Sequence, residues 1–305
     1  MLRLSRHRLL SAFSAATLGL TACAMMMRPA CAAPGGAQSM GKSLGPATVA
    51  PASPTPIPTL AQPTTIKVGV MAGEDEDVWR VVQANAKPHN LNIELVTFSD
   101  YTTPNQALEE HDINANAFQN QPYLDAQIKA RGYHIVRVGD TQLEPIGIYS
   151  IKVKALKDLP KNAHIAVPND PSNEGRSLLM LEHEGVLKVS KSAGLFPTAL
   201  DITDNPKNVT VQELDASLTS RSLKDVDAAV INGNWAIKGG VDVQHQRIAL
   251  ENAQGSPYVN FIAVNADDAG KPWVKTLVAA FHQPDVAAEI TKVYHGAAQP
   301  AFTHG

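Results

Sequence analysis

From Ile66 onward, short apolar runs that suit β-strands alternate with longer stretches whose apolar residues recur at helical spacing. Alternation of this kind favours an α/β fold in which parallel strands are flanked by helices. The strands are expected at 66–70, 93–98, 113–118, 135–138, 165–167, 209–214 and 227–232. The helices are expected at 78–86, 105–109, 122–131, 172–184, 218–223, 273–281 and 286–294.

Two extended apolar runs, 145–151 and 258–264, divide the alternating pattern into two cycles. We therefore predict two lobes joined by a pair of crossing strands. Residues 66–148 and 258–305 are expected to form lobe 1, and residues 149–257 are expected to form lobe 2. Ligands of such folds bind in a crevice at the carboxyl ends of the strands. The predicted binding site is therefore the space between the lobes.

The first residues have the order of an export signal. A cluster of arginines precedes the apolar run Leu9–Leu20, and the sequence Leu20-Thr21-Ala22-Cys23 then matches a lipobox. We predict a signal peptide over residues 1–22 and acylation of Cys23. The apolar run is shorter than the roughly 20 residues of a spanning helix, which disfavours a transmembrane anchor. Cleavage after Ala30-Cys31-Ala32 is an alternative, but an intervening arginine and the long distance from the apolar run disfavour it.

Proline, alanine, serine, threonine and glycine dominate residues 34–65. Proline favours extended conformations, and the segment has too little apolar surface to offset the entropy lost on ordering. We therefore predict that residues 23–65 form a lipidated tether that holds the folded part away from a membrane.

Composition and motifs exclude several classes of function. A net charge of −3 gives no basic surface for nucleic acid. Both cysteines, Cys23 and Cys31, lie in the leader region, so the folded part has no thiol chemistry, disulfide or cysteine metal site. From Ile66 onward, the G-x-S-x-G, H-E-x-x-H and G-x-x-x-x-G-K-[ST] motifs are absent. We expect no catalytic residue, no metal and no cofactor, and the acidic run 74–77 is interpreted as a solvated cap of the first helix.

Arg176 is the unusual residue of the segment 170–176, which follows a strand and opens a helix. A cation in the first turn interacts unfavourably with the helix dipole, at a cost of about 0.3–1 kcal/mol in helix stability. A bound carboxylate would reverse that penalty, because free backbone N–H groups and a guanidinium both suit an anion. Pairing of Arg176 with Glu174 or Asp170 on a solvated face is an equally good interpretation.

Two other strand ends carry polar and aromatic side chains. Phe118-Gln119-Asn120-Gln121-Pro122-Tyr123 leads from a strand into a helix, and Tyr101 follows the preceding strand. These residues form either a core or the wall of a small-molecule pocket. Asn232 and Asn234 end another strand and could bind an ammonium or a carboxylate. The glycine between them also suits a simple tight turn.

Several motifs occur together and in order: Phe98-Ser99-Asp100-Tyr101, Phe118-Gln119 with Pro122-Tyr123-Leu124, Pro145 to Ser150, Pro168 to Arg176, and Ser256 to Asn260. In these motifs the chain, from about Ile66 to its end, resembles the methionine-binding lipoproteins of ABC importers. The resemblance implies a two-lobed periplasmic-binding-protein fold. It also implies capture of an amino acid, with L-methionine expected, and delivery to a membrane permease with a cytoplasmic ATPase. The protein would be anchored in the cell envelope by its lipid and would face the periplasm, with inner and outer membrane both open.

The resemblance also implies roles for individual residues. Tyr101, Phe118 and Tyr123 would surround the ligand side chain, and Arg176 would hold its carboxylate. The remaining pocket residues would be Asn120, Asn232 and Asn260, the last two orienting the polar end of the zwitterion.

The chain departs from the family at Asn120 and Gln121, where a histidine and a lysine are common, and in its acidic loop 73–77. The change of pocket wall leaves a methionyl dipeptide open as the ligand. An interaction role as a surface lipoprotein also stays open. An acid should balance buried Arg176, and Glu174 and Asp100 are the candidates.

Replacing Cys23 by serine tests the predicted anchor. Serine has no thiol to carry the lipid, so Cys23→Ser should move the protein from the membrane to the soluble fraction and leave ligand binding unchanged. Fractionation followed by immunodetection measures the first effect. A variant that stays in the membrane fraction would contradict the predicted lipidation.

Overall fold

The computed structural model describes residues 54–302. The predicted signal peptide, both cysteines and most of the predicted tether lie outside this range. Within it, no helix has both the length and the apolar character required to cross a membrane.

The first sheet has the strand order β13-β4-β12-β3-β1-β2. Strand β1 pairs in parallel with β2 and β3, whereas β12 is antiparallel to both β3 and β4. The alternating pattern predicted parallel sheets, which is wrong for β12 because this strand returns from the other lobe. The strands are β1 (Thr64–Met71), β2 (Leu91–Phe98), β3 (Ala115–Asn120), β4 (Ile135–Leu143), β12 (Val259–Asn265) and β13 (Gln299–Pro300).

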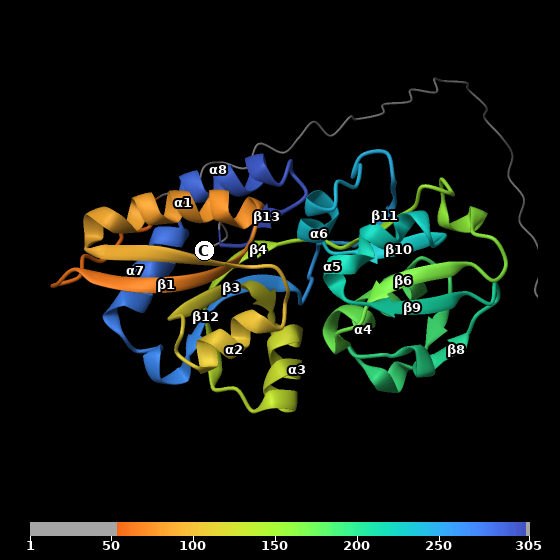
Figure 1. Cartoon of the computed structure of the whole chain (residues 1–305), viewed down its shortest axis with the longest axis horizontal. Coiled ribbons are helices and arrows are strands. Elements are labelled where there is room, and N and C mark those ends of the chain that lie inside the picture. The colour runs from red at the N-terminus through yellow and green to blue at the C-terminus, as the bar shows by residue number, and fades with distance from the viewer. Residues whose placement is uncertain (1–53, 303–305) are drawn as a thin grey trace, which may run out of the picture. The chain divides into compact units, whose positions relative to one another are not determined.

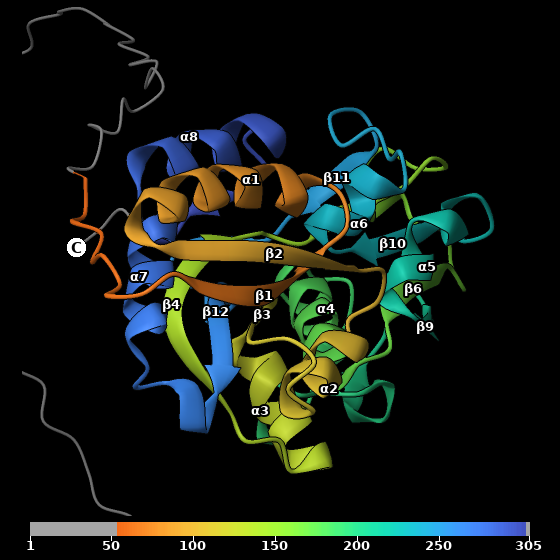
Figure 2. The ribbon, with the colours of Figure 1, turned by 60° about the vertical axis from the view of Figure 1, so that its left-hand side comes forward.

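Helices cover both faces of this sheet. Strand β12 shows the two-sided pattern, since Ile262 and Val264 belong to one core cluster and Phe261 and Ala263 to another. Figures 1 and 2 show α1 and α8 on one side of β1 and β2, and α2 and α3 on the other. The helices are α1 (Glu74–Ala86), α7 (Pro272–Phe281) and α8 (Pro284–Val293) on the first face, and α2 (Thr103–Glu109) and α3 (Gln121–Arg131) on the second.

The second sheet has the order β11-β5-β10-β6-β9. Helix α4 (Pro171–His183) packs on one face, and α5 (Ala216–Thr219) and α6 (Gly233–Lys238) pack on the other. The strands are β5 (Gly147–Tyr149), β6 (His164–Pro168), β9 (Thr210–Leu214), β10 (Ala228–Ile231) and β11 (Arg247–Leu250), and β7 (Lys188–Val189) and β8 (Ile202–Asp204) form a separate pair. The short 3-10 helices of the protein are η1 (Lys87–His89), η2 (Leu156–Asp158), η3 (Lys191–Ala193), η4 (Ala199–Asp201), η5 (Arg221–Lys224) and η6 (Ala266–Asp268).

The chain passes between the sheets twice, at residues 144–146 between β4 and β5 and at residues 251–258 between β11 and β12. We call these segments the first and second crossing. They contact each other, because the backbone N–H of Glu251 donates to the carbonyl of Ile146 at 3.0 Å. The second sheet begins at Gly147, whereas the sequence placed residues 147 and 148 with the first lobe.

Two local predictions differ from the structure. The helix expected at 218–223 is divided into α5 and η5. The turn considered at Asn232 to Asn234 is instead the start of α6, with Asn232 at its N-cap position. Glycine at the first helical position of α6 hid this helix from analysis of the sequence pattern.

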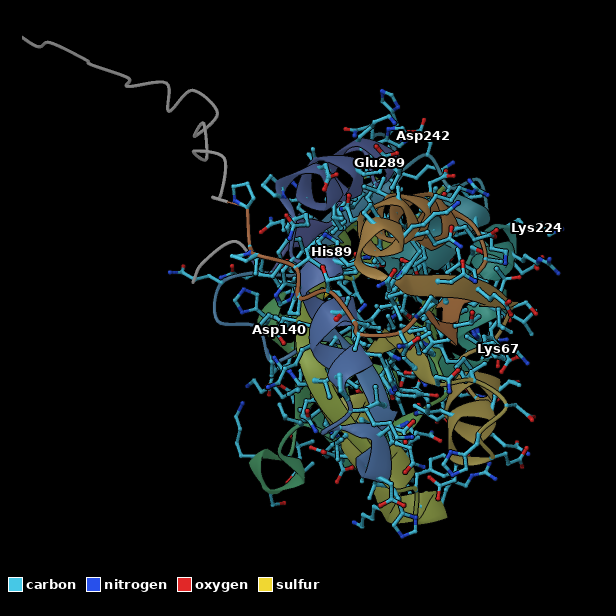
Figure 3. The ribbon with its side chains drawn as sticks, turned by 90° about the vertical axis from the view of Figure 1, so that its left-hand side faces the viewer. Lys67, His89, Asp140, Lys224, Asp242 and Glu289 are labelled. Carbon is cyan, nitrogen blue, oxygen red and sulfur yellow. The ribbon has the colours of Figure 1, made fainter. Side chains whose placement is uncertain are left out.

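The last part of the predicted tether packs against the first lobe. Leu60 is buried in the core cluster that contains α7 and α8. Thr276 donates its hydroxyl to the carbonyl of Pro58 at 2.9 Å, and Thr59 hydrogen-bonds with the ring of His89, which Figure 3 labels beside this segment. Strand β1 itself begins at Thr64. Residues 55–64 are therefore part of the folded lobe.

Gly175 tests the packing that positions helix α4. A Cβ atom at this position would lie 2.4 Å from the carbonyl oxygen of Leu195 and 2.9 Å from the Cα of Phe196. We expect Gly175→Ala to lower the free energy of unfolding by about 1–3 kcal/mol, despite the better helix propensity of alanine. The control is Gly270→Ala, which meets no atom within 4 Å. Urea denaturation measures both, and equal stability of the two variants would contradict this packing.

Candidate functional site

One cavity takes its walls from both sheets and from the first crossing. All seven residues that the sequence predicted to bind ligand lie along it. The lining residues are Met71, Asp75, Tyr101, Phe118, Gln119, Asn120, Tyr123, Glu144, Asn173, Arg176, Asn232, Gly233, Asn234 and Asn260. Most of them follow the carboxyl ends of β1, β2, β3, β6 and β10, as expected for a doubly wound fold.

Arg176 is 3% exposed and makes three kinds of contact. Its Nε donates to Oε1 of Glu251 at 2.8 Å, and its Nη2 bonds to the other oxygen of the same carboxylate. Nη2 also donates to the backbone carbonyl of Glu144 at 2.9 Å, and the guanidinium carbon lies 4.2 Å from the ring centre of Tyr258. The interpretation of Arg176 as a solvated residue paired with Glu174 or Asp170 is wrong.

The acids that the sequence offered as counter-charges to Arg176 have other roles. Glu174 accepts from the backbone N–H of Ala199 at 3.1 Å. Asp100 accepts from the backbone N–H groups of Thr102 and Thr103, and these bonds and those from the threonine hydroxyls outweigh desolvation and lower its pKa. The partner of Arg176 is Glu251. Sequence analysis missed it because the second crossing carries no periodic pattern.

Two further carboxylates, Asp75 and Glu144, line the cavity. Oδ1 of Asp75 accepts from the hydroxyl of Tyr294 at 2.7 Å, and Oε1 of Glu144 accepts from Nε2 of Gln142 at 2.9 Å. Burial, and then the charge of Glu144, raises the pKa of Asp75 to about 7. Burial also raises the pKa of Glu144, although the bond from Gln142 and the charge of Arg176 oppose this effect.

The sequence contained a signal for Asp75. The interpretation of the acidic run 74–77 as wholly solvated is wrong, because Asp75 is buried. Asp75, Val78, Trp79 and Val82 share the buried face of α1 at spacings of three, four and seven residues. A carboxylate in the apolar stripe of a helix therefore marked this position.

The aromatic side of the cavity is formed by Tyr101, Phe118 and Tyr123. Their ring centres lie 5.8–6.2 Å apart. The hydroxyl of Tyr123 donates to the carbonyl of Tyr101 at 2.6 Å, and the hydroxyl of Tyr101 donates to Oδ1 of Asn234 in the other lobe, also at 2.6 Å. Burial raises the pKa of both tyrosines, so their hydroxyls stay neutral.

Amide side chains complete the wall. Oδ1 of Asn120 accepts from the backbone N–H of Tyr123 at 3.1 Å and so caps α3. Nδ2 of Asn260 lies 3.4 Å from Oε1 of Glu144. Nδ2 of Asn232 donates to Oδ1 of Asn173 at 2.9 Å, whereas Oδ1 of Asn232 is buried without a partner among residues 54–302. Gln121 is not part of the lining and instead bonds to Asp125.

Asp75 makes stability depend on pH. Its pKa is about 7 in the folded protein, against an ordinary value of 3.8, so folding favours the protonated form. This contribution is complete below pH 4 and is lost as the pH rises through about 7. The stability of Asp75→Asn relative to the unaltered protein should therefore increase from pH 4 to pH 8, by on the order of 1 kcal/mol or more. Urea denaturation of the ligand-free protein measures it, with exposed Asp77→Asn as control, and a flat difference for Asp75→Asn would contradict it.

Comparisons with known proteins agree with this architecture. The family model described as NlpA lipoprotein matches residues 66–302. The D-methionine-binding lipoprotein MetQ of Salmonella typhimurium is 46% identical over 239 residues, which is 77% of this chain and 88% of the relative.

Solved structures are similar over the same region. A nutrient binding protein from Burkholderia cenocepacia bound to methionine has a TM-score of 0.76 at 51% identity and covers 78% of this chain and 100% of its own. A periplasmic substrate-binding protein of an ABC transporter from Coxiella burnetii has a TM-score of 0.74 at 43% identity, with coverage of 77% and 100%. These similarities confirm the predicted two-lobed periplasmic-binding-protein fold, and the chain belongs to the NlpA lipoprotein family.

Proposed function

We propose that this protein is the solute-binding lipoprotein of an ABC importer and that it captures methionine in the cavity between its lobes. The observation that carries the proposal is the presence, in one cavity, of a buried guanidinium, the carboxylates of Asp75 and Glu144 and an aromatic wall. A free amino acid with an apolar side chain needs all three when water leaves both of its charged groups.

Arg176 would bind the ligand carboxylate. Its Nε and Nη2 are engaged by Glu251 and the first crossing, while Nη1 makes no hydrogen bond to residues 54–302. A guanidinium held by one carboxylate still has donors for a second, and charge-assisted bonds of this kind are about twice as strong as neutral ones. Glu251 therefore fixes the orientation of the Arg176 guanidinium, and the Nη1 group of that guanidinium is available to the ligand.

Glu144 and Asp75 would receive the ligand ammonium. Both line the cavity, and burial raises the pKa of both carboxyl groups. An ammonium within hydrogen-bonding distance would stabilise the ionised forms. Asn260, bonded to Glu144, would help to hold that carboxylate in place.

The aromatic wall suits a thioether. Tyr101, Phe118 and Tyr123 present ring surfaces, and the two tyrosine hydroxyls already donate hydrogen bonds within the protein, so the wall makes apolar contacts with the ligand. Contacts between sulfur and an aromatic ring contribute roughly 0.3–1.5 kcal/mol each. Asn120 stands where the family often has histidine, and it keeps an amide at the edge of this wall.

Membership of the family and the N-terminal sequence support a location in the cell envelope. Acylation of Cys23 would anchor the protein in the cell envelope with the folded lobes facing the periplasm. Closure of the lobes on methionine would present a shape that the permease recognises. The tether would then begin at Cys23 and end near residue 54, where the chain joins the first lobe.

Isothermal titration calorimetry tests the ligand. The purified full-length protein is titrated with both enantiomers of methionine, a methionyl dipeptide and leucine, after any co-purified ligand has been removed and identified by native mass spectrometry. Methionine should bind most tightly. Failure of both enantiomers to bind would refute the proposal, and chemical change of the recovered ligand would indicate an enzyme instead.

Arg176→Ala should weaken methionine binding by about 2–5 kcal/mol, because it removes one partner of a desolvated charge pair. Arg80→Ala removes an exposed arginine of α1 and should leave the affinity unchanged. Glu251→Gln should keep the Arg176 guanidinium in place and should therefore retain methionine binding. Unchanged affinity in a folded Arg176→Ala variant would exclude the carboxylate role.

A further inference from the structure

The side chain of Asn232 forms unusual hydrogen bonds for its position in the fold. It occupies the N-cap of α6, where an asparagine normally accepts from a backbone N–H of the first turn, but its side chain makes no such bond. Asn120 and Asp170, at the N-caps of α3 and α4, do make it. The amide of Asn232 is therefore oriented by something other than its own helix.

The orienting partner is Asn173. Nδ2 of Asn232 donates to Oδ1 of Asn173 at 2.9 Å, and Nδ2 of Asn173 in turn donates to Oδ2 of Asp170 at 2.9 Å. Asn173 is 3% exposed and Asn232 is 8% exposed, so water has little access to either amide. The three residues form a continuous hydrogen-bonded chain that ends at the cavity, which Asn173 and Asn232 line.

The carboxylate at the far end determines the direction of every bond. An ionised carboxylate only accepts, so Asn173 must turn its NH₂ group toward Asp170 and its oxygen toward Asn232. Asn232 must then turn its NH₂ group toward Asn173. Its own oxygen is left as the free atom, and that oxygen is buried without a partner among the described residues. A buried acceptor without a donor is destabilising unless a ligand supplies one.

We propose that Asp170, acting through Asn173, is a positioning residue that fixes Oδ1 of Asn232 as an acceptor for the ligand ammonium. The inference rests on the proposed function, because it assigns a residue to the cationic end of the same ligand. It makes the site selective for ligands that carry a donor at the α position. Neither Asp170 nor Asn173 is required to touch the ammonium for this effect.

Asp170→Asn reverses the direction of the hydrogen bonds from residue 170 through Asn173 to Asn232, and it does not remove the N-cap of α4. The new amide keeps one oxygen for the backbone N–H of Asn173, which Asp170 now accepts at 2.9 Å, and presents NH₂ where Oδ2 was. Both amides beyond it must then turn over, and Asn232 presents NH₂ toward the ammonium. Methionine affinity should fall about 10- to 100-fold, as for loss of a hydrogen bond to a charged group.

Calorimetry with two ligands separates positioning from general damage. The α-hydroxy analogue of methionine carries a hydroxyl that both donates and accepts, so Asp170→Asn should change its affinity little. Asp215→Asn makes the same substitution at the N-cap of α5, outside the cavity lining, and should change neither affinity. The double variant Asp170→Asn/Asn232→Asp moves the carboxylate to the cavity end and should recover methionine binding.

Equal loss of both ligands in Asp170→Asn, no loss of either, or no recovery in the double variant would overturn the inference. If Asp170→Asn fails to fold by circular dichroism, Asn173→Leu interrupts the same chain at its centre and should give the same selective loss of methionine. Absence of methionine binding to the unaltered protein would instead refute the proposed function. Methionine binding that depends on Arg176 but not on Asp170 would refute only the positioning role.

Discussion

The guanidinium of Arg176 joins the two segments that connect the lobes. It donates to the backbone of Glu144 in the first crossing and to the side chain of Glu251 in the second, and it stacks on Tyr258, also in the second. Helix α4 belongs to the second lobe, so the side chain of Arg176 connects that lobe to both crossings. Ligand contact at the free edge of the same group would reach both crossings directly.

The charges around the cavity favour a ligand that brings a cation. Arg176 is already paired with Glu251, which leaves Glu144 and Asp75 without a basic partner among the described residues. Desolvation makes two nearby carboxylates costly, and the raised pKa of Asp75 is the direct expression of that cost. A zwitterion adds an ammonium for these acids and a carboxylate for Arg176, so it improves both ends of the cavity at once.

The fold could be predicted from sequence wherever a periodic pattern existed. Apart from β13, the strands and helices of the first lobe follow apolar periodicity and were found within a few residues. Strand β12 was found, but not its antiparallel direction, because direction depends on the path of the chain through the other lobe. The helix after Asn232 was missed since Gly233 suggests a turn.

For a related reason, only part of the candidate site could be predicted from the sequence. Arg176 was identified because a cation conflicts with the first turn of a helix. Its partner Glu251 and the acid Glu144 lie in the irregular crossings, where no pattern predicts which side chains turn inward. Asp75 could have been found from the helical stripe that it shares with Trp79. Sequence analysis can thus locate charged residues that conflict with a helical pattern, such as Arg176 and Asp75. It misses charged residues in irregular segments, such as Glu251 and Glu144.

Three helices begin where the cavity lies, and their first residues show why stability and binding share the same contacts. Asn120, Asp170 and Asn232 occupy the N-cap positions of α3, α4 and α6, each at the end of a strand or within two residues of it. Asn120 caps its helix with the oxygen of an amide that also lines the cavity, and Asp170 caps α4 while it orients Asn173. Asn232 alone makes no capping bond, and its free oxygen remains inside the protein. An N-cap contributes about 1 kcal/mol to a helix, so leaving α6 uncapped is costly. A ligand that donates to that oxygen would offset this cost.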